Sequence, residues 1–121
     1  MLRIIPLGGV GEIGRNSLVI EYGDDIIVVD AGLMFPRNDM LGVDLVIADY
    51  SYLKQRADRV RAIFITHGHE DHTGGLPYLL RHVQAPIYAT PLTCGLVEVK
   101  LKEHKLRDEA DLRTVGPGDT I

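Results

Sequence analysis

The chain has 121 residues, which is enough for one small domain. Hydrophobic residues make up 45% of it and charged residues 25%, and this balance excludes an intrinsically disordered chain. The net charge of −4 argues against a generally basic nucleic-acid-binding surface. It does not exclude a nuclease, because bound divalent ions would bring positive charge to the site itself.

Composition also indicates where the protein works. No apolar run approaches the roughly 20 residues of a membrane span, and the first residues lack the length of a secretory signal. The one cysteine, Cys94, cannot form a disulfide framework, which agrees with a reducing compartment, and we expect it to be a small packing residue. We therefore expect a cytoplasmic protein with no membrane partner.

The first part of the chain predicts strands around a glycine-rich loop. Residues 2–7 form an apolar strand that ends at glycine, and residues 9–14 match the pattern G-x-G-x-x-G. A dinucleotide site would need a helix to start there, but residues 17–22 and 26–29 are instead two β-branched runs joined as a hairpin by a Gly-Asp-Asp turn. We therefore reject a dinucleotide site and expect the loop to pass close to a functional site.

Asp30 ends the second hairpin strand, where it is either a turn residue or a functional one. Residues 33–44 contain turn formers and predict a loop long enough to lie across a face of the site. Residues 51–58 predict one or two helical turns with a solvated, charged face.

The most informative segment follows a buried strand predicted over residues 62–66. His67, His69, Asp71 and His72 fall within six residues there, and imidazoles with a carboxylate are ligands for zinc and sometimes for manganese. His67 and His69 are two apart in extended chain, so both can face one ion, with Gly68 leaving the approach free. Asp71 and His72 open a helix and can face a second ion. Two ions about 3.5–4 Å apart suit phosphodiester hydrolysis.

The rest of the chain alternates helix and strand. A helix is predicted over 76–83, a strand over 85–89, a helix over 91–104 and a strand over 112–115. His82 and His104 lie on the predicted helices, and we do not expect either to be a metal ligand. The predicted class is therefore α/β.

At this point the sequence resembles a known family. The pattern His67-x-His69-x-Asp71-His72 is the signature of the metallo-β-lactamase superfamily, and segments 6–16, 29–36 and 74–80 are similar to the ribonuclease J family of the β-CASP branch. The resemblance implies one half of a four-layer αββα sandwich and a zinc-dependent ribonuclease acting on RNA as a 5′–3′ exonuclease and endonuclease. It also implies two Zn²⁺ ions in a complete site, with Mn²⁺ or Mg²⁺ as alternatives. Asp30 would hold a ligand histidine by hydrogen bonding.

The resemblance also implies ligands that this sequence lacks. A complete site in the superfamily takes a distal histidine and a bridging aspartate from later in the chain, and no residue after His72 has the expected surroundings. We therefore expect residues 1–121 to be an N-terminal fragment of that domain, with the rest of it and the β-CASP domain missing. Such a fragment should bind metal weakly, be inactive alone, and self-associate through its exposed sheet.

Two alternatives stay open. One is a hydrolase of the same fold that acts on a small ester, thioester or lactam. The other is a non-catalytic module in which the metal motif supports folding or assembly.

Overall fold

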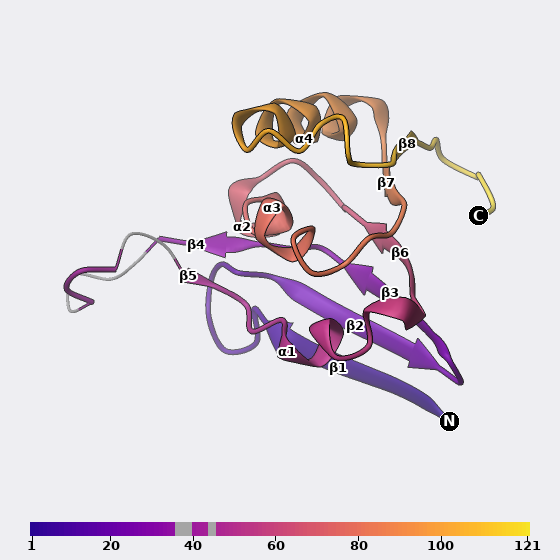
Figure 1. Cartoon of the computed structure of the whole chain (residues 1–121), viewed down its shortest axis with the longest axis horizontal. Helices are drawn as coiled ribbons and strands as arrows, with labels where there is room; N and C mark the ends of the chain where they lie inside the picture. The colour runs from indigo at the N-terminus through magenta and orange to yellow at the C-terminus, as the bar shows by residue number, and fades with distance from the viewer. Residues whose placement is uncertain (36–39, 44–45) are drawn as a thin grey trace.

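The computed structural model describes residues 1–35, 40–43 and 46–121 of the chain (Figure 1). The loop predicted over 33–44 lies partly outside the described residues, so its expected position across the site stays a prediction. The strands have these bounds: β1 Leu2–Gly8, β2 Ser17–Tyr22, β3 Asp25–Val29, β4 Leu33–Met34, β5 Val46–Ile47, β6 Val60–Phe64, β7 Ile87–Ala89 and β8 Leu112–Thr114.

Six of these strands form one mixed sheet in the order β1-β2-β3-β6-β7-β8. The strands β1, β2 and β3 pair antiparallel, and the pairing of β2 with β3 is the one that the hairpin signal predicts. The strands β6, β7 and β8 continue the sheet in parallel pairs. Parallel neighbours need crossover connections, and helices supply these between β6 and β7 and between β7 and β8.

The sheet has one face that carries the core. The strand registers align one residue from each strand in a row across this face, and these are Ile5, Val19, Val28, Ile63, Ile87 and Leu112. All six belong to the hydrophobic core or pack against it, together with Leu53, Leu79 and Val97 from the helices. Side chains alternate along a strand, so the neighbouring residues form a second face of the sheet.

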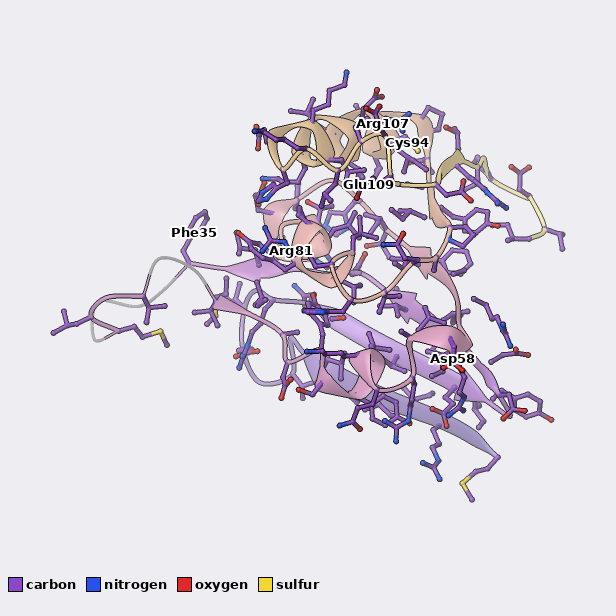
Figure 2. All side chains as sticks on the ribbon, viewed as in Figure 1. Phe35, Asp58, Arg81, Cys94, Arg107 and Glu109 are labelled. Carbon is purple, nitrogen blue, oxygen red and sulfur yellow. The ribbon has the colours of Figure 1, made fainter. Side chains whose placement is uncertain are left out.

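The helices are short except for one. Their bounds are α1 Ser51–Lys54, the 3-10 turn η1 Ala57–Arg59, α2 Glu70–Thr73, α3 Leu76–Leu79 and α4 Pro91–Glu103. Figure 1 shows α4 beside β7 and β8. Cys94 on α4 is buried, with its Sγ 3.3 Å from the carbonyl oxygen of Ala89, so it packs as predicted (Figure 2). Of the helices that the structure describes, none has the length and apolar character needed to cross a lipid bilayer.

Three expectations about these elements need correction. The helix predicted over 76–83 ends at Leu79 and continues as hydrogen-bonded turns to Val83. Residues 33–34, predicted as loop, form β4, which pairs with β5 in a separate small sheet. A two-residue strand is too short to show an alternating pattern, so periodicity cannot reveal it. The buried strand predicted over 62–66 is β6, which starts two residues earlier and ends at Phe64.

Candidate metal centre

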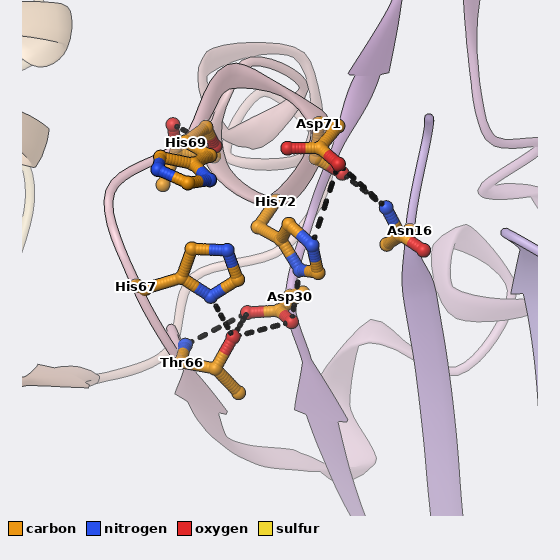
Figure 3. Close-up of polar contacts among 8 residues, drawn as sticks. Asn16, Asp30, Thr66, His67, His69, Asp71 and His72 are labelled. Atoms are coloured by element: carbon orange, nitrogen blue, oxygen red, sulfur yellow. Dashed lines mark hydrogen bonds and ion pairs between the residues drawn. The ribbon is translucent and has the colours of Figure 1, made fainter. Parts of the chain in front are cut away.

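The predicted metal motif lies where the chain leaves β6 and enters α2. Asp30 follows the neighbouring parallel strand β3, and its backbone N–H donates to the carbonyl oxygen of Phe64 at 2.8 Å. The carboxyl ends of the two strands therefore meet at one edge of the sheet, which is where open α/β sheets bind ligands. Sequence positions far apart are brought together here (Figure 3).

Three of the four predicted ligands converge. His67, His69 and Asp71 each offer one ligand atom, and these atoms lie within 4.8 Å of one another. Two atoms that each bind one zinc at about 2.1 Å can be at most about 4.2 Å apart, so small side-chain rotations would let all three hold one ion. His69 is exposed, and His67 and Asp71 are partly exposed, so the cluster is open to solvent. The donor set fits a divalent metal.

His72 is held differently. Its Nδ1 lies 2.7 Å from Oδ2 of Asp30, and its Nε2 lies 3.5 Å from Oδ2 of Asp71. The ring of His72 also lies 4.0 Å from the ring of His67, measured between centroids. Asp71 thus lies near His67 and His69 as well as near His72, while Nδ1 of His72 faces Asp30. The division into a His67–His69 pair and an Asp71–His72 pair stays a prediction.

Asp30 occupies a constrained position beneath the motif. It is 6% exposed, and its φ of 65° places a non-glycine residue in the left-handed region. Such a conformation costs on the order of 1 kcal/mol and persists only where surrounding contacts hold it. Here the carboxylate accepts the His72 contact and hydrogen bonds from the backbone and the hydroxyl of Thr66. The arrangement suits the support of a ligand histidine that the family resemblance implies.

Two glycines allow the close packing around the motif. A β-carbon on Gly32 would collide with the backbone oxygen of Asp71, so only glycine fits where the segment between β3 and β4 packs against α2. A β-carbon on Gly68 would meet Leu96 of α4. We predicted that Gly68 leaves the approach of His67 and His69 to the ion free of a β-carbon. The contact found is a different one, because a β-carbon on Gly68 would point toward α4.

Two further residues join the site without having been singled out from the sequence. Asn16 donates from Nδ2 to the backbone oxygen of Asp71 at 2.9 Å and to its Oδ2 at 3.4 Å. Thr66 bonds to Asp30 and also lies 3.0 Å from Nδ1 of His67. Asn16 stands at the end of the glycine-rich loop, so that loop does pass close to the site. The one sequence signal for Asn16 was its place in segment 6–16, which resembles the ribonuclease J family.

The remaining histidines lie apart from this cluster. His82 lines a cavity of about 350 Å³ formed with residues of β5, α1 and α3. His104 packs edge-on against Tyr78, with ring centroids 5.6 Å apart. Neither histidine belongs to the candidate metal-binding group found within the described part of the chain, which consists of His67, His69 and Asp71.

Comparison with known proteins identifies the family. A model described as "Metallo-beta-lactamase superfamily" matches residues 10–117. The chain belongs to the metallo-β-lactamase superfamily. Ribonuclease J2 of Bacillus subtilis (strain 168) is 57% identical over 114 residues, which are 94% of this chain and 20% of that protein. Ribonuclease J 1 of Streptococcus pyogenes serotype M3 is 56% identical over 107 residues, 88% of this chain and 19% of that protein.

The superfamily fold is also found among solved structures. Zn²⁺-bound PqqB from Methylobacterium extorquens superposes with a TM-score of 0.65 at 14% identity, over 100% of this chain and 48% of that one. The predicted class, α/β with the N-terminal half of the superfamily's αββα sandwich, is confirmed, as is the resemblance to ribonuclease J. The chain spans about a fifth of the length of the curated relatives it matches.

Proposed function

We propose that this chain is part of a metal-dependent ribonuclease that hydrolyses RNA phosphodiester bonds in the cytoplasm. The observation that carries the proposal is the convergence of His67, His69 and Asp71 in a chain that is 57% identical to the matching segment of a ribonuclease J2. By that similarity, the complete enzyme would act as a 5′–3′ exonuclease and endonuclease in RNA processing and decay. RNA is the proposed partner.

Zn²⁺ is the proposed metal, with Mn²⁺ or Mg²⁺ as alternatives and two ions in a complete site. His67, His69, Asp71 and His72 would hold the metal, and Asp30 would support His72. When bound, such ions act as Lewis acids and lower the pKa of water at neutral pH. The chain's own part is to present imidazole nitrogens and a carboxylate at an open edge of the sheet, where an extended phosphodiester can approach.

We further propose that residues 1–121 form a partial metallo-β-lactamase domain that is inactive alone. The described residues bring together three ligand atoms, whereas a dinuclear site of this superfamily needs more. The remaining ligands and a β-CASP domain would come from further chain, or a neighbouring copy would supply ligands in a homo-oligomer.

A substrate comparison tests the proposed function. The product of the complete gene should cleave single-stranded RNA and leave β-lactam, ester and thioester substrates intact, and His67→Ala/His69→Ala should abolish the cleavage. The isolated 121-residue chain should leave the same RNA uncut. Hydrolysis of a lactam or thioester in place of RNA would contradict the proposal. Robust RNA cleavage by the purified monomeric chain would contradict the claim that the chain is incomplete.

A further inference from the structure

Thr66 lies between the buried carboxylate of Asp30 and the first motif histidine. Its backbone N–H donates to Oδ1 of Asp30 at 2.8 Å, which fixes the residue against β3. Its hydroxyl oxygen lies 2.8 Å from Oδ2 and 3.0 Å from Oδ1 of the same carboxylate. On its other side the hydroxyl is 3.0 Å from Nδ1 of His67 (Figure 3).

The direction of these bonds follows from counting protons. The Asp30 carboxylate has no proton to give, so the Thr66 hydroxyl must donate its single proton to it. The hydroxyl oxygen can then only accept from the ring of His67, so in a neutral ring Nδ1 of His67 carries the proton and Nε2 keeps its lone pair. The same carboxylate accepts from Nδ1 of His72 at 2.7 Å, so a neutral His72 ring likewise has its proton on Nδ1 and a free Nε2.

We propose that Thr66 is a positioning residue that sets the tautomer of His67, so that Asp30 orients two histidines at once. Asp30 acts on His72 directly and on His67 through the Thr66 hydroxyl. Both rings then present Nε2 as the free ligand nitrogen. The inference rests on the proposed function in one respect, namely that these nitrogens hold a metal. The tautomer itself follows from the geometry of the protein alone.

His69 provides an internal comparison. Its ring contacts the ring of His67, with centroids 4.7 Å apart, and among the described residues its nitrogens have no hydrogen-bond partner. The Asp30–Thr66 pair therefore does not fix the tautomer of His69. A change at Thr66 should act on the ring of His67 and leave those of His69 and His72 as they are.

The test is ¹⁵N NMR of the histidine rings in the metal-free chain, at a pH where all rings are neutral. Thr66→Val removes the hydroxyl and keeps the shape and the backbone N–H, whereas Thr66→Ser restores the hydroxyl. We expect His67 to be mainly Nδ1-protonated in the unsubstituted chain and in Thr66→Ser. In Thr66→Val the ratio of the two His67 tautomers should move several-fold toward Nε2–H, while His72 stays Nδ1-protonated. An amide spectrum of each variant shows that the chain remains folded.

Zn²⁺ titration of the same samples separates this inference from the proposed function. Loss of a residue that supports a metal ligand typically weakens affinity about 10-fold to 100-fold, so Thr66→Val should bind Zn²⁺ more weakly by that range and Thr66→Ser should not. A His67 tautomer ratio that is the same in Thr66→Val overturns the inference, whatever the affinity. Absence of Zn²⁺ uptake by the unsubstituted chain would contradict metal binding by these residues in the isolated chain, and the tautomer shift still decides the role of Thr66.

Discussion

Asp71 is contacted by a residue from a distant part of the sequence, Asn16. Asn16 holds Asp71 through its own backbone N–H, at 2.9 Å from the Asp71 backbone oxygen, and through its side-chain amide. The same amide approaches the carboxylate at 3.4 Å, which is a long contact. The backbone bond would survive truncation of Asn16, so a substitution there should loosen the carboxylate more than the fold.

Asn16→Ala should therefore weaken Zn²⁺ binding by roughly 10-fold, since outer residues of metal sites act on affinity by that order. Isothermal titration with Zn²⁺ measures the change. Ile13→Ala is the matched control, because Ile13 lies in the same loop and is 90% exposed. Equal affinity in the Asn16→Ala variant and the control would show that Asn16 does not position Asp71.

The motif residues could be predicted from the sequence, whereas the residues that hydrogen-bond to them, Asn16 and Thr66, could not. The spacing of His67, His69 and Asp71 is local, so a short segment contains its whole signal. Asn16 lies in a loop and Thr66 follows a strand, where their residue types are common. Their hydrogen-bond partners, Asp71 and Asp30, are 55 and 36 residues away in the sequence. Only the fold brings these pairs together, so neither pattern nor composition could assign them.

At the scale of elements, α2 packs closely against the segment that joins β3 to β4. The segment from Asp30 to Gly32 packs against the backbone of α2, with the N–H of Ala31 donating to the oxygen of His72 at 2.9 Å. Gly32 permits this approach, whereas Gly95 lies in the middle of α4 with nothing within 4 Å of its missing β-carbon. The two glycines should respond oppositely to the same substitution.

Gly32→Ala should lower the free energy of unfolding by about 3 kcal/mol, because backbone cannot move aside as a side-chain end can. Gly95→Ala should raise it by roughly 0.5–1 kcal/mol, since alanine loses less conformational freedom in a helix. Urea denaturation of both variants gives the comparison. A Gly32→Ala chain as stable as the unsubstituted one would mean that the segment after β3 and α2 are not packed this closely.

A hydrogen bond ties α1 to the sheet. The hydroxyl of Tyr52 donates to Oε1 of Glu21 on β2 at 2.6 Å, and Arg59 lies 3.4 Å from the other carboxylate oxygen. The Tyr52 bond is the main cause that lowers the pKa of Glu21 below its ordinary value, with the charge of Arg59 adding to it. A lowered pKa in the folded state contributes stability above the ordinary pKa, and this contribution is lost as the pH falls through the lowered value.

Tyr52→Phe should therefore be less stable than the unsubstituted chain at pH 7, and the difference should shrink on acidification below about pH 4. Thermal unfolding at a series of pH values measures it. A difference that is constant down to pH 2 would show that the hydroxyl acts without regard to the charge of Glu21. Tyr22→Phe is a suitable control, because Tyr22 lies next to Glu21 on β2 and is 69% exposed.

The hairpin of β2 and β3 and the helix α4 were predicted from the sequence, whereas the two-residue strand β4 was not. The hairpin of β2 and β3 has turn chemistry and β-branched runs, and α4 is long enough to be recognised. The two-residue strands β4 and β5 are defined only by their pairing with each other. Their existence depends on tertiary contact, which a single segment does not encode.

At the scale of the whole molecule, the sheet has a second apolar face opposite the helices. The registers align Ile4, Ile20, Ile27 and Ala62 in one row and Leu18, Val29, Phe64 and Tyr88 in another. Ile4 is 59% exposed, and Leu18, Ile20, Ile27, Val29 and Phe64 are only partly buried. Exposed apolar patches of this kind favour association, as half of a sandwich fold would lead one to expect.

The isolated chain should therefore self-associate through this face. Ile4→Lys should shift its sedimentation toward monomer, because a charge would be carried into the contact. Val99→Lys is the matched control, since Val99 is 56% exposed on α4 at the other side of the sheet. A chain that is monomeric at all concentrations would contradict the prediction, as would equal effects of the two substitutions.

Metal binding by the chain is measured most directly by equilibrium dialysis against Zn²⁺, with bound metal quantified by elemental mass spectrometry. We expect saturable, weak uptake by the unsubstituted chain and its loss in His67→Ala/His69→Ala. His82→Ala, which removes a histidine outside the cluster, should bind as the unsubstituted chain does. No uptake at all, or equal uptake by the double variant, would contradict the claim that His67, His69 and Asp71 form a metal centre.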